Sequence, residues 1–417
     1  MTSPDDTLSA SAAQFSDLHK SSDLADAPMI FRAAFKTMAR NWVAGDLTFL
    51  TPTGGQLRLK GHGGGPQAVI QIKDYRFIRR ALASGDIGFA EGYIAGEWDT
   101  PDLTAVLSVF SLNFEQLKRV TEGNPLMGMI NFVSHAFNGN SREGSRRNIH
   151  AHYDLGNAFY SRWLDPTMTY SAARFERPDQ PLNEAQRNKY KTLAEQMELA
   201  PDHHVLEIGC GWGGFAEFAA GEIGAKVTGI TISQEQYDFA AKRMFDQGLN
   251  EKVDIQLIDY RDVAGRYDRV ASIEMFEAVG ERYWPAYFGK VREVLNPGGR
   301  AGLQIITIQD QIFEGYRRRA DFIQKYIFPG GMLPSEARLK AETERAGLVW
   351  TGIGRFGLNY ADTLAAWRRA FDGAWEEIRH LGFDERFRRL WRFYLSYCDA
   401  GFRTGRTDVV QLGLVKA

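Results

Sequence analysis

The sequence has few cysteines, almost no net charge and no long apolar run. Two cysteines among 417 residues, Cys210 and Cys398, argue against a disulfide scaffold and fit a reducing cytoplasm. No stretch reaches the roughly 18 apolar residues of a membrane-spanning helix, and the polar, acidic N-terminus does not resemble a signal peptide. With a net charge of −2, no global field favours nucleic acid or an anionic membrane. We therefore expect a cytoplasmic protein, soluble or peripheral to a membrane, with no nucleic-acid partner.

The composition and length allow a large core in more than one domain. Hydrophobic residues make up 44% of the chain, with 27 phenylalanines and 9 tryptophans, enough for a lipid-sized pocket. A chain of this length is expected to contain two or three domains. The local composition predicts a disordered N-terminus (residues 1–27), a smaller α+β domain (28–136), a linker rich in Asn, Ser, Gly and Arg (137–147) and a larger second domain (148–417).

The smaller domain opens with a strongly amphipathic segment, residues 29–43. Its apolar residues share one face and its basic residues repeat every four positions beside it: Phe31, Phe35, Met38 and Trp42 against Arg32, Lys36 and Arg40. Such a helix lies on an anionic bilayer or packs against its own domain, and the pattern leaves both interpretations open. Residues 46–61 then alternate apolar and polar on both sides of a Pro/Gly turn, which predicts a β-hairpin.

A glycine-rich turn between a strand and a helix dominates the second domain. Residues 205–219 read VLEIGCGWGGFAEFA, an apolar strand, a turn with several glycines and the start of an amphipathic helix. Glycines in such a turn let the backbone approach a ligand, which the helix N–H groups then face. A glycine motif alone is weak evidence, so the neighbouring strands decide which cofactor it holds.

The following strands indicate S-adenosylmethionine rather than a dinucleotide. A dinucleotide site usually has an acid at the end of its second strand, whereas strand 225–231 continues into Ile-Ser and then Gln234, Glu235 and Gln236. Next come a strand ending in Asp259, a strand within YDRVASIEMFEAVG and the turn LNPGG. This order is typical of class I S-adenosylmethionine methyltransferases, a Rossmann-like α/β fold with a doubly wound sheet. An insertion at 310–334 is expected to cover the substrate site at the carboxyl ends of the strands.

Several motifs resemble the cyclopropane-fatty-acyl-phospholipid synthase family, which includes mycolic-acid cyclopropane synthases and fatty-acid methyltransferases. They occur in the family's order: HYDLGNAFYSRWLDPTMTYS, LEIGCGWGG, TISQEQ, SIEMFEAVG, YIFPGGMLPS, NYADTLAAW and YLSYCDAGFR. The resemblance runs from about residue 150 to the end of the chain. The N-terminal part is similar to the family's accessory domain, which implies lipid engagement and a homo-oligomer.

The resemblance implies transfer of the methyl carbon of S-adenosylmethionine to a cis double bond in an acyl chain of a membrane phospholipid. The enzyme would then be peripheral on the inner face of the membrane. An alkene is a poor nucleophile, so the sulfonium must be held dry and in line with it. Aromatic faces stabilise the resulting carbocation, and a base must remove a proton. In this family that base is thought to be a bound bicarbonate.

The resemblance also assigns a set of cofactor-binding residues: Tyr170, Ser171, Leu206, Glu207, Gly209, Cys210, Gly211, Gly213, Gly214, Thr231, Gln236, Asp259 and Tyr260. Gly209 and Gly211 would let the methionine moiety approach the backbone. Thr231 and Gln236 can hydrogen-bond the ribose hydroxyls, and Asp259 can accept a hydrogen bond from the adenine amine. Glu207 equally fits a structural residue at the end of its strand.

The implied bicarbonate site consists of Glu277, Tyr360 and Cys398, with two departures from the cyclopropane synthases. Ala172 replaces a cysteine whose contact is largely through the backbone, and Gln304 stands at the position assigned to a histidine. A glutamine can donate a hydrogen bond to an anion but cannot carry a proton's charge. If the cation loses its proton elsewhere than from the transferred methyl, the product is methyl-branched rather than a cyclopropane.

Five aromatic residues are candidates for lining an acyl channel, although each alone is equally typical of a core: Tyr283, Trp284, Tyr326, Phe328 and Phe402. Two other classes of function remain open at this point. One is a small-molecule N- or O-methyltransferase on the same fold, because fold alone does not fix the substrate. The other is a non-catalytic lipid-binding protein derived from a methyltransferase.

Overall fold

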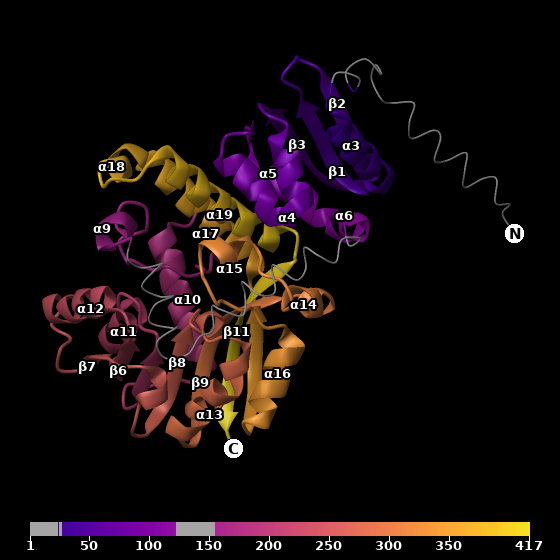
Figure 1. The fold of residues 1–417 in the computed structure, drawn as a ribbon. Coiled ribbons are helices and arrows are strands. Elements are labelled where there is room, and N and C mark those ends of the chain that lie inside the picture. Colours follow the sequence, from indigo (N-terminus) through magenta and orange to yellow (C-terminus); the bar gives the residue numbers. More distant parts are fainter. Residues whose placement is uncertain (1–23, 25–26, 122–154) are drawn as a thin grey trace, which may run out of the picture. The chain divides into compact units, whose positions relative to one another are not determined.

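The computed structural model describes residues 24, 27–121 and 155–417, and the chain divides into two compact units (Figure 1). Unit 1 is Met1–Ile130 with Asp384–Thr404, and unit 2 is Asn131–Phe383 with Gly405–Ala417. The predicted linker 137–147 and nearly all of the predicted disordered N-terminus lie outside the described residues. The sequence placed residues 148–417 in a single domain, whereas the structure assigns residues 384–404 to unit 1.

Unit 1 is built on a four-stranded sheet with the order β2-β1-β3-β4. Strands β1 and β2 form the predicted antiparallel hairpin, and β3 pairs with β1 in parallel. The elements are β1 (Ala44–Leu50), β2 (Gln56–Lys60), β3 (Gly63–Ile72), β4 (Trp98–Asp99), α3 (Met29–Asn41), α4 (Arg76–Ile94), α5 (Leu103–Leu112) and α6 (Phe114–Thr121). Non-helical backbone at Gly85 kinks α4, as expected for helices interrupted by glycine.

Helix α3 packs its aromatic face inside unit 1. Phe31 and Phe35 are fully buried, and the ring of Phe31 meets those of Phe49 and Tyr75 edge-on at 5.6 and 5.1 Å. The predicted amphipathic helix is therefore present, and its apolar face is used for intramolecular packing. Its basic residue Lys36 is exposed on the other side.

Helix α19 (Glu385–Arg403) belongs to unit 1 because one arginine ties it to the end of α4 and the start of β4. Arg389 donates hydrogen bonds to the carbonyl oxygens of Tyr93 (2.6 Å) and Trp98 (3.0 Å). Its guanidinium also lies 4.0 Å from the centre of the Tyr93 ring. These tertiary contacts join segments almost 300 residues apart, so no local pattern could have indicated them.

Unit 2 contains a seven-stranded sheet with the order β10-β11-β9-β8-β5-β6-β7 (Figure 1). Strands β5 to β9 pair in parallel, whereas the last strand, β11, lies antiparallel between β9 and β10. The strands are β5 (His204–Ile208), β6 (Lys226–Thr231), β7 (Val253–Leu257), β8 (Tyr267–Ile273), β9 (Leu295–Ile308), β10 (Leu348–Arg355) and β11 (Thr407–Lys416). The predicted doubly wound sheet is confirmed.

Separate core clusters form around this sheet because neighbouring strand residues point to opposite faces. Val205 packs with helices α10, α11 and α12, while the next residue, Leu206, packs with α13 and α16. The α-helices in the described part of unit 2 are α9 (Asn157–Tyr160), α10 (Leu182–Gln196), α11 (Gly214–Phe218), α12 (Gln234–Asp246), α13 (Trp284–Val294), α14 (Asp310–Tyr316), α15 (Phe322–Tyr326), α16 (Glu336–Arg345), α17 (Gly357–Gly373) and α18 (Trp375–Arg379). Within the described residues no helix has both the length and the apolar character of a membrane span.

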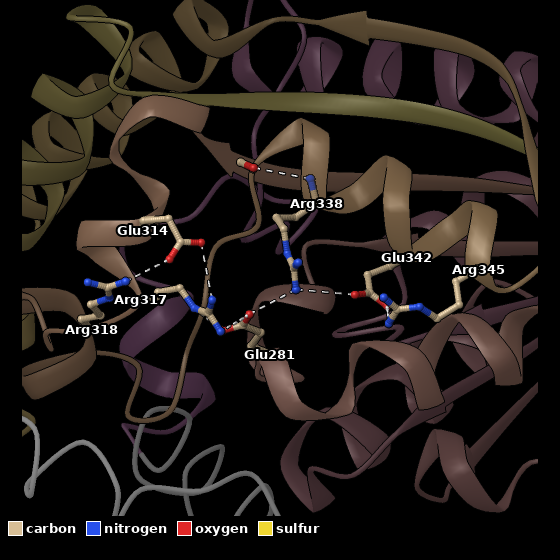
Figure 2. Close-up of polar contacts among 8 residues, drawn as sticks. Glu281, Glu314, Arg317, Arg318, Arg338, Glu342 and Arg345 are labelled. Atoms are coloured by element: carbon tan, nitrogen blue, oxygen red, sulfur yellow. Dashed lines mark hydrogen bonds and ion pairs between the residues drawn. The ribbon is translucent and has the colours of Figure 1, made fainter.

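The segment 310–334 contains the helices α14 and α15 and follows β9, whose carboxyl end lies on the ligand-binding side of such sheets. The C-terminal end of this segment is attached to β9 and to the loop after β8. Ile308 N–H donates to Pro334 O (2.9 Å), and Met332 N–H donates to Glu277 O (2.8 Å). An ion-pair cluster fastens the helices further. Figure 2 shows Glu281 between Arg317 and Arg338, at 2.8 and 3.3 Å.

Neutralising Glu281 should loosen this segment. Both arginines are about one-third exposed and would lose their shared acceptor, so Glu281→Gln should lower the free energy of unfolding by about 1–2 kcal/mol. Urea unfolding at low and high salt measures this cost, which should shrink with salt. The matched control is Glu376→Gln, an exposed residue with only a 3.8 Å ion pair. Equal stability of both variants would contradict the assigned role of Glu281.

Candidate active site

The glycine-rich turn lies between β5 and α11 at the carboxyl edge of the sheet. Gly209, Gly211 and Gly213 have φ values of 80°, 53° and 85°, which L side chains rarely adopt. A Cβ atom on Gly209 would lie 2.7 Å from Met275 Cγ. The loop is anchored because the amides of Gly209 and Cys210 donate to Ile230 O at 3.0 and 2.9 Å. The turn therefore presents backbone rather than side chains on this edge.

A buried polar cluster lies beside the turn. Lys189 on α10 is fully buried and donates to Ser171 Oγ at 2.7 Å, and burial lowers the pKa of its ammonium to about 7. Glu207 is 2% exposed, and its Oε2 has no hydrogen-bond partner among the described residues. Burial raises the pKa of this carboxyl to about 8. An orphaned buried acceptor beside bare backbone fits a ligand that carries a hydrogen-bond donor or a cation.

The start of α12 forms a second side of this site. Ser233 caps the helix by accepting from Gln236 N–H, and Thr231 Oγ1 donates to Gln236 Oε1 at 2.8 Å. After β7, Asp259 accepts from Arg261 Nε and Nη2 at 2.8 and 2.5 Å. Gln236 and Asp259 are therefore held in fixed orientations, which suits recognition of hydroxyl and amine groups.

The sequence did not single out Glu274, a carboxylate at this edge that accepts hydrogen bonds from three different residues. It follows β8 directly and is partly buried. Its Oε2 accepts from Tyr360 Oη at 2.6 Å, and its Oε1 accepts from Gln304 Nε2 at 2.7 Å and from Ala172 N at 2.8 Å. The position of Glu274 immediately after a strand was the available signal, but only the fold could show which donors would converge on it.

Glu277 lies three residues after Glu274 and accepts a hydrogen bond from β9 beyond the point where β8 stops pairing with it. Strand β8 pairs with β9 only as far as Gln304, and the amide of Ile306 then donates to Glu277 Oε1 at 2.5 Å. Oε2 of Glu277 is buried without a hydrogen-bond partner in the described part of the chain. Burial, followed by the charge of Glu274, raises the pKa of Glu277 to about 8.

The amide of Gln304, which the resemblance implied would donate to a bound anion, is hydrogen-bonded to protein groups. Its Nε2 donates to Glu274 and, at 3.4 Å, to the carbonyl oxygen of Ala172. Its Oε1 accepts from Gln411 Nε2 at 3.1 Å. Both ends of the amide are thus occupied by protein groups, so Gln304 orients Glu274 in this structure.

The structure brings most of the predicted residues of unit 2 to one edge of the sheet. Exceptions are Leu206 and Cys210, whose side chains pack in the core, and Trp284, which is a fully buried core residue. Tyr260 stacks edge-on against Tyr287 at 5.5 Å, and burial raises its pKa to about 12. Cys398 and Phe402 lie on α19 in unit 1.

Aromatic rings surround the Tyr170 segment, as expected for a site that must exclude water. Tyr170 lies 5.4 Å from Tyr160, 5.6 Å from Trp163 and 5.1 Å from Trp367, measured between ring centroids. Trp212, within the glycine turn, lies 5.1 Å from Tyr160. Among the described residues, no group of His, Cys, Asp and Glu is arranged to hold a metal ion.

The raised pKa of Glu277 predicts a measurable dependence of stability on pH. Between the ordinary value of 4.5 and about 8, the folded protein keeps a proton that the unfolded chain has released, so this group lowers stability as pH rises. Glu277→Gln should reduce the loss of unfolding free energy between pH 5 and pH 8 by on the order of 1–3 kcal/mol. Urea unfolding at several pH values measures it. Exposed Glu195→Gln is the control, and an unchanged slope for Glu277→Gln would refute the assignment.

Strand order, glycine turn and polar edge together define the fold of a class I S-adenosylmethionine-dependent methyltransferase. The solved structures agree: the chain superposes on the cyclopropane synthase MmaA2 from Mycobacterium tuberculosis with a TM-score of 0.61 and 30% identity, covering 65% of this chain and 98% of that one. The mycolic acid cyclopropane synthase CmaA1, complexed with SAH and CTAB, gives 0.62 and 31%, over 65% and 98%.

The chain belongs to the mycolic acid cyclopropane synthetase family, whose model matches residues 140–412. It is 41% identical over 346 residues to the tuberculostearic acid methyltransferase of Mycobacterium tuberculosis, covering 81% of each chain. It is 35% identical over 357 residues to the cyclopropane-fatty-acyl-phospholipid synthase of Escherichia coli, covering 82% of this chain and 86% of that one. The resemblance stated from the motifs is thereby confirmed.

Proposed function

We propose that this protein transfers the methyl carbon of S-adenosylmethionine to a cis double bond in an unsaturated fatty acyl chain of a membrane phospholipid. The observation that carries the proposal is the hydrogen-bonded carboxylate of Glu274 one residue before Met275, the residue that packs against the glycine turn. The proposed cofactor site and the proposed proton acceptor are thus contiguous. The family membership supplies the lipid substrate class.

The residues at the edge of the sheet fit the cofactor. The backbone of Gly209 and Gly211 is open to a methionine moiety, and the unpartnered Oε2 of Glu207 would accept from its ammonium group. Gln236 and Asp259 would contact the ribose and adenine. The cofactor supplies a methyl group activated by a sulfonium, and the protein must hold it away from water.

The product has two candidates. A cyclopropane results if a proton leaves the transferred methyl. It is the first candidate because relatives with 30–35% identity are named cyclopropane synthases. A methyl-branched chain is the second, because the 41% identical relative is a tuberculostearic acid methyltransferase. Gln304 also keeps the second candidate open, since an amide occupied at both ends stands where the resemblance to cyclopropane synthases implied a histidine.

We further propose that the enzyme works as a homo-oligomer, peripheral on the inner face of the membrane. The exposed basic residues Lys36 and Arg40 of α3 would then contact anionic headgroups. Vesicle flotation with and without anionic lipid tests this contact, and it should weaken in high salt.

The proposed reaction is tested in bacteria that lack their own cyclopropane synthase and are fed methyl-trideuterated methionine. Mass spectrometry of the membrane fatty acids counts the deuterium atoms on the added carbon. Two would mean that a proton left the transferred methyl, as in a cyclopropane or an exomethylene product. Three would mean that the methyl arrived whole and the chain is branched. No labelled lipid would overturn the proposal in favour of a small-molecule substrate.

A further inference from the structure

The polar groups around Glu274 form a complete anion-binding site that the protein fills with its own side chain. Tyr360 Oη, Gln304 Nε2 and the amide of Ala172 all donate to the carboxylate within 2.8 Å. One donor reaches Oε2 and two reach Oε1. A planar carboxylate held by three directed donors has little freedom to turn, so its remaining lone pairs point in fixed directions.

These donors coincide with positions that the family resemblance implied for a bound bicarbonate. Tyr360, Gln304 and the backbone at Ala172 were each expected to face that anion, and in the structure each donates to Glu274. Bicarbonate and a carboxylate share a planar carbon with two oxygen acceptors. One set of donors cannot hold both groups in the same place.

We propose that the carboxylate of Glu274 is the internal base of the transfer reaction and takes the place of bicarbonate. This rests on the proposed function. In the step assigned to it, a C–H bond of the substrate cation breaks and an O–H bond forms on Glu274. The C–H electron pair closes the new C–C bond of a ring or the C=C bond of a branched chain. No added oxidant, reductant or metal is required.

The electrostatic setting suits a base. Burial raises the pKa of Glu274, while the hydrogen bonds from Tyr360 and Ala172 and the charge of Lys189 hold it down. Desolvation thus increases the basicity of the carboxylate, and the donors oppose part of that rise in pKa. A general base is most effective when its pKa lies near the working pH.

The backbone provides independent support. Glu274 has φ of 49°, in the left-handed region that strains a residue with a side chain and that glycine adopts freely. Strain of this kind persists where the surroundings enforce it and concentrates at functional sites. It also makes Glu274→Gly a benign backbone change, which leaves the donors in place and opens the space that the carboxylate fills.

The test compares Glu274→Gln and Glu274→Gly with the wild type, using the purified full chain, labelled S-adenosylmethionine and vesicles of cis-unsaturated phospholipid. The control is Glu198→Gly, a second glutamate at positive φ (48°), whose side chain is 63% exposed in an ion pair with Arg300. Turnover is measured in carbon dioxide-free buffer and with added bicarbonate. Binding of ¹³C-bicarbonate, followed by NMR without cofactor or lipid, is the readout that does not depend on activity.

The wild type and Glu198→Gly should turn over equally with and without bicarbonate and should not bind it. Glu274→Gln should lose at least about 100-fold in turnover at every bicarbonate concentration, because its amide fills the space without accepting a proton. Glu274→Gly should be inactive alone, bind bicarbonate and recover part of its activity with it. Unchanged thermal unfolding would show that these variants fold.

Three results would overturn the inference while leaving the proposed function intact. They are bicarbonate-dependent turnover by the wild type, retained activity of Glu274→Gln, and failure of Glu274→Gly to bind or use bicarbonate. Absence of lipid labelling by the wild type itself would instead overturn the proposed function. The assignment of Glu274 as the base of that reaction would then fall as well.

Discussion

Gly209→Ala is expected to weaken binding of S-adenosylmethionine by at least about 30-fold, which corresponds to about 2 kcal/mol. The reason is local geometry. Gly209 has φ of 80°, and an added Cβ would lie 2.7 and 2.9 Å from Met275 Cγ and Cβ. The turn must shift to relieve this overlap, and it then loses the position in which its backbone meets the cofactor.

The same substitution should lower the free energy of unfolding by about 1–3 kcal/mol, since alanine is strained at this φ. Calorimetric titration and urea unfolding measure the two effects. Gly289→Ala is the matched control, because Gly289 lies exposed in α13 with nothing within 4 Å of an added Cβ. It should leave binding unchanged and raise stability by about 0.5–1 kcal/mol. Undiminished binding by Gly209→Ala would show that the turn does not hold the cofactor.

Tyr360→Phe is expected to reduce turnover by up to about 10-fold near neutral pH. Burial raises the pKa of Glu274, and the hydrogen bond from Tyr360 is the first of the effects that oppose it. Without the hydroxyl, 2.6 Å from Glu274 Oε2, the pKa of Glu274 rises further, so the carboxylate ionises only at higher pH. Because only the ionised form accepts a proton, the rising limb of the pH–activity profile should move to higher pH by about one unit.

The profile separates this effect from a general loss of structure. A variant damaged in its packing would lose activity at all pH values, whereas Tyr360→Phe should recover toward wild-type turnover in alkaline solution. Tyr267→Phe is the control, because Tyr267 begins the same strand whose other end leads to Glu274, and its hydroxyl donates only a 3.4 Å bond to Ala264 O. A pH-independent loss in Tyr360→Phe would contradict the assigned hydrogen bond.

The fold of unit 2 could be predicted because short stretches of its sequence determine where its strands and turns lie. Apolar strands alternate with helical segments, and glycines stand where the backbone needs positive φ, so period and turn chemistry pointed to the same sheet. The proposed cofactor-binding residues came from the resemblance of the motifs to a known family and stay a prediction. Helix α19 was placed in the wrong unit because its attachment depends on Arg389 meeting carbonyl groups of α4 and β4.

The centre of the candidate site was harder to predict for the same reason. Lys189 belongs to a highly polar segment, LNEAQRNKYKTLAEQ, which resembles a solvent-facing helix, yet Lys189 and Gln186 are fully buried. Their partners are Ser171 Oγ and Ser171 O, on a loop that no periodicity describes. Glu274 was likewise passed over for Glu277, because nothing in the sequence shows which of two nearby acids meets Tyr360 and Gln304.

The most direct test of the account is the fate of the methyl group in a purified system. The protein is incubated with S-adenosylmethionine carrying a trideuterated methyl group and with vesicles of a phospholipid whose acyl chains contain one cis double bond. The lipid is then hydrolysed, and the masses of the fatty acids and of the headgroups are measured separately by mass spectrometry. We expect the mass of the fatty acid to increase by one deuterated carbon, located at the former double bond. Label confined to the headgroup or to a water-soluble product would contradict it.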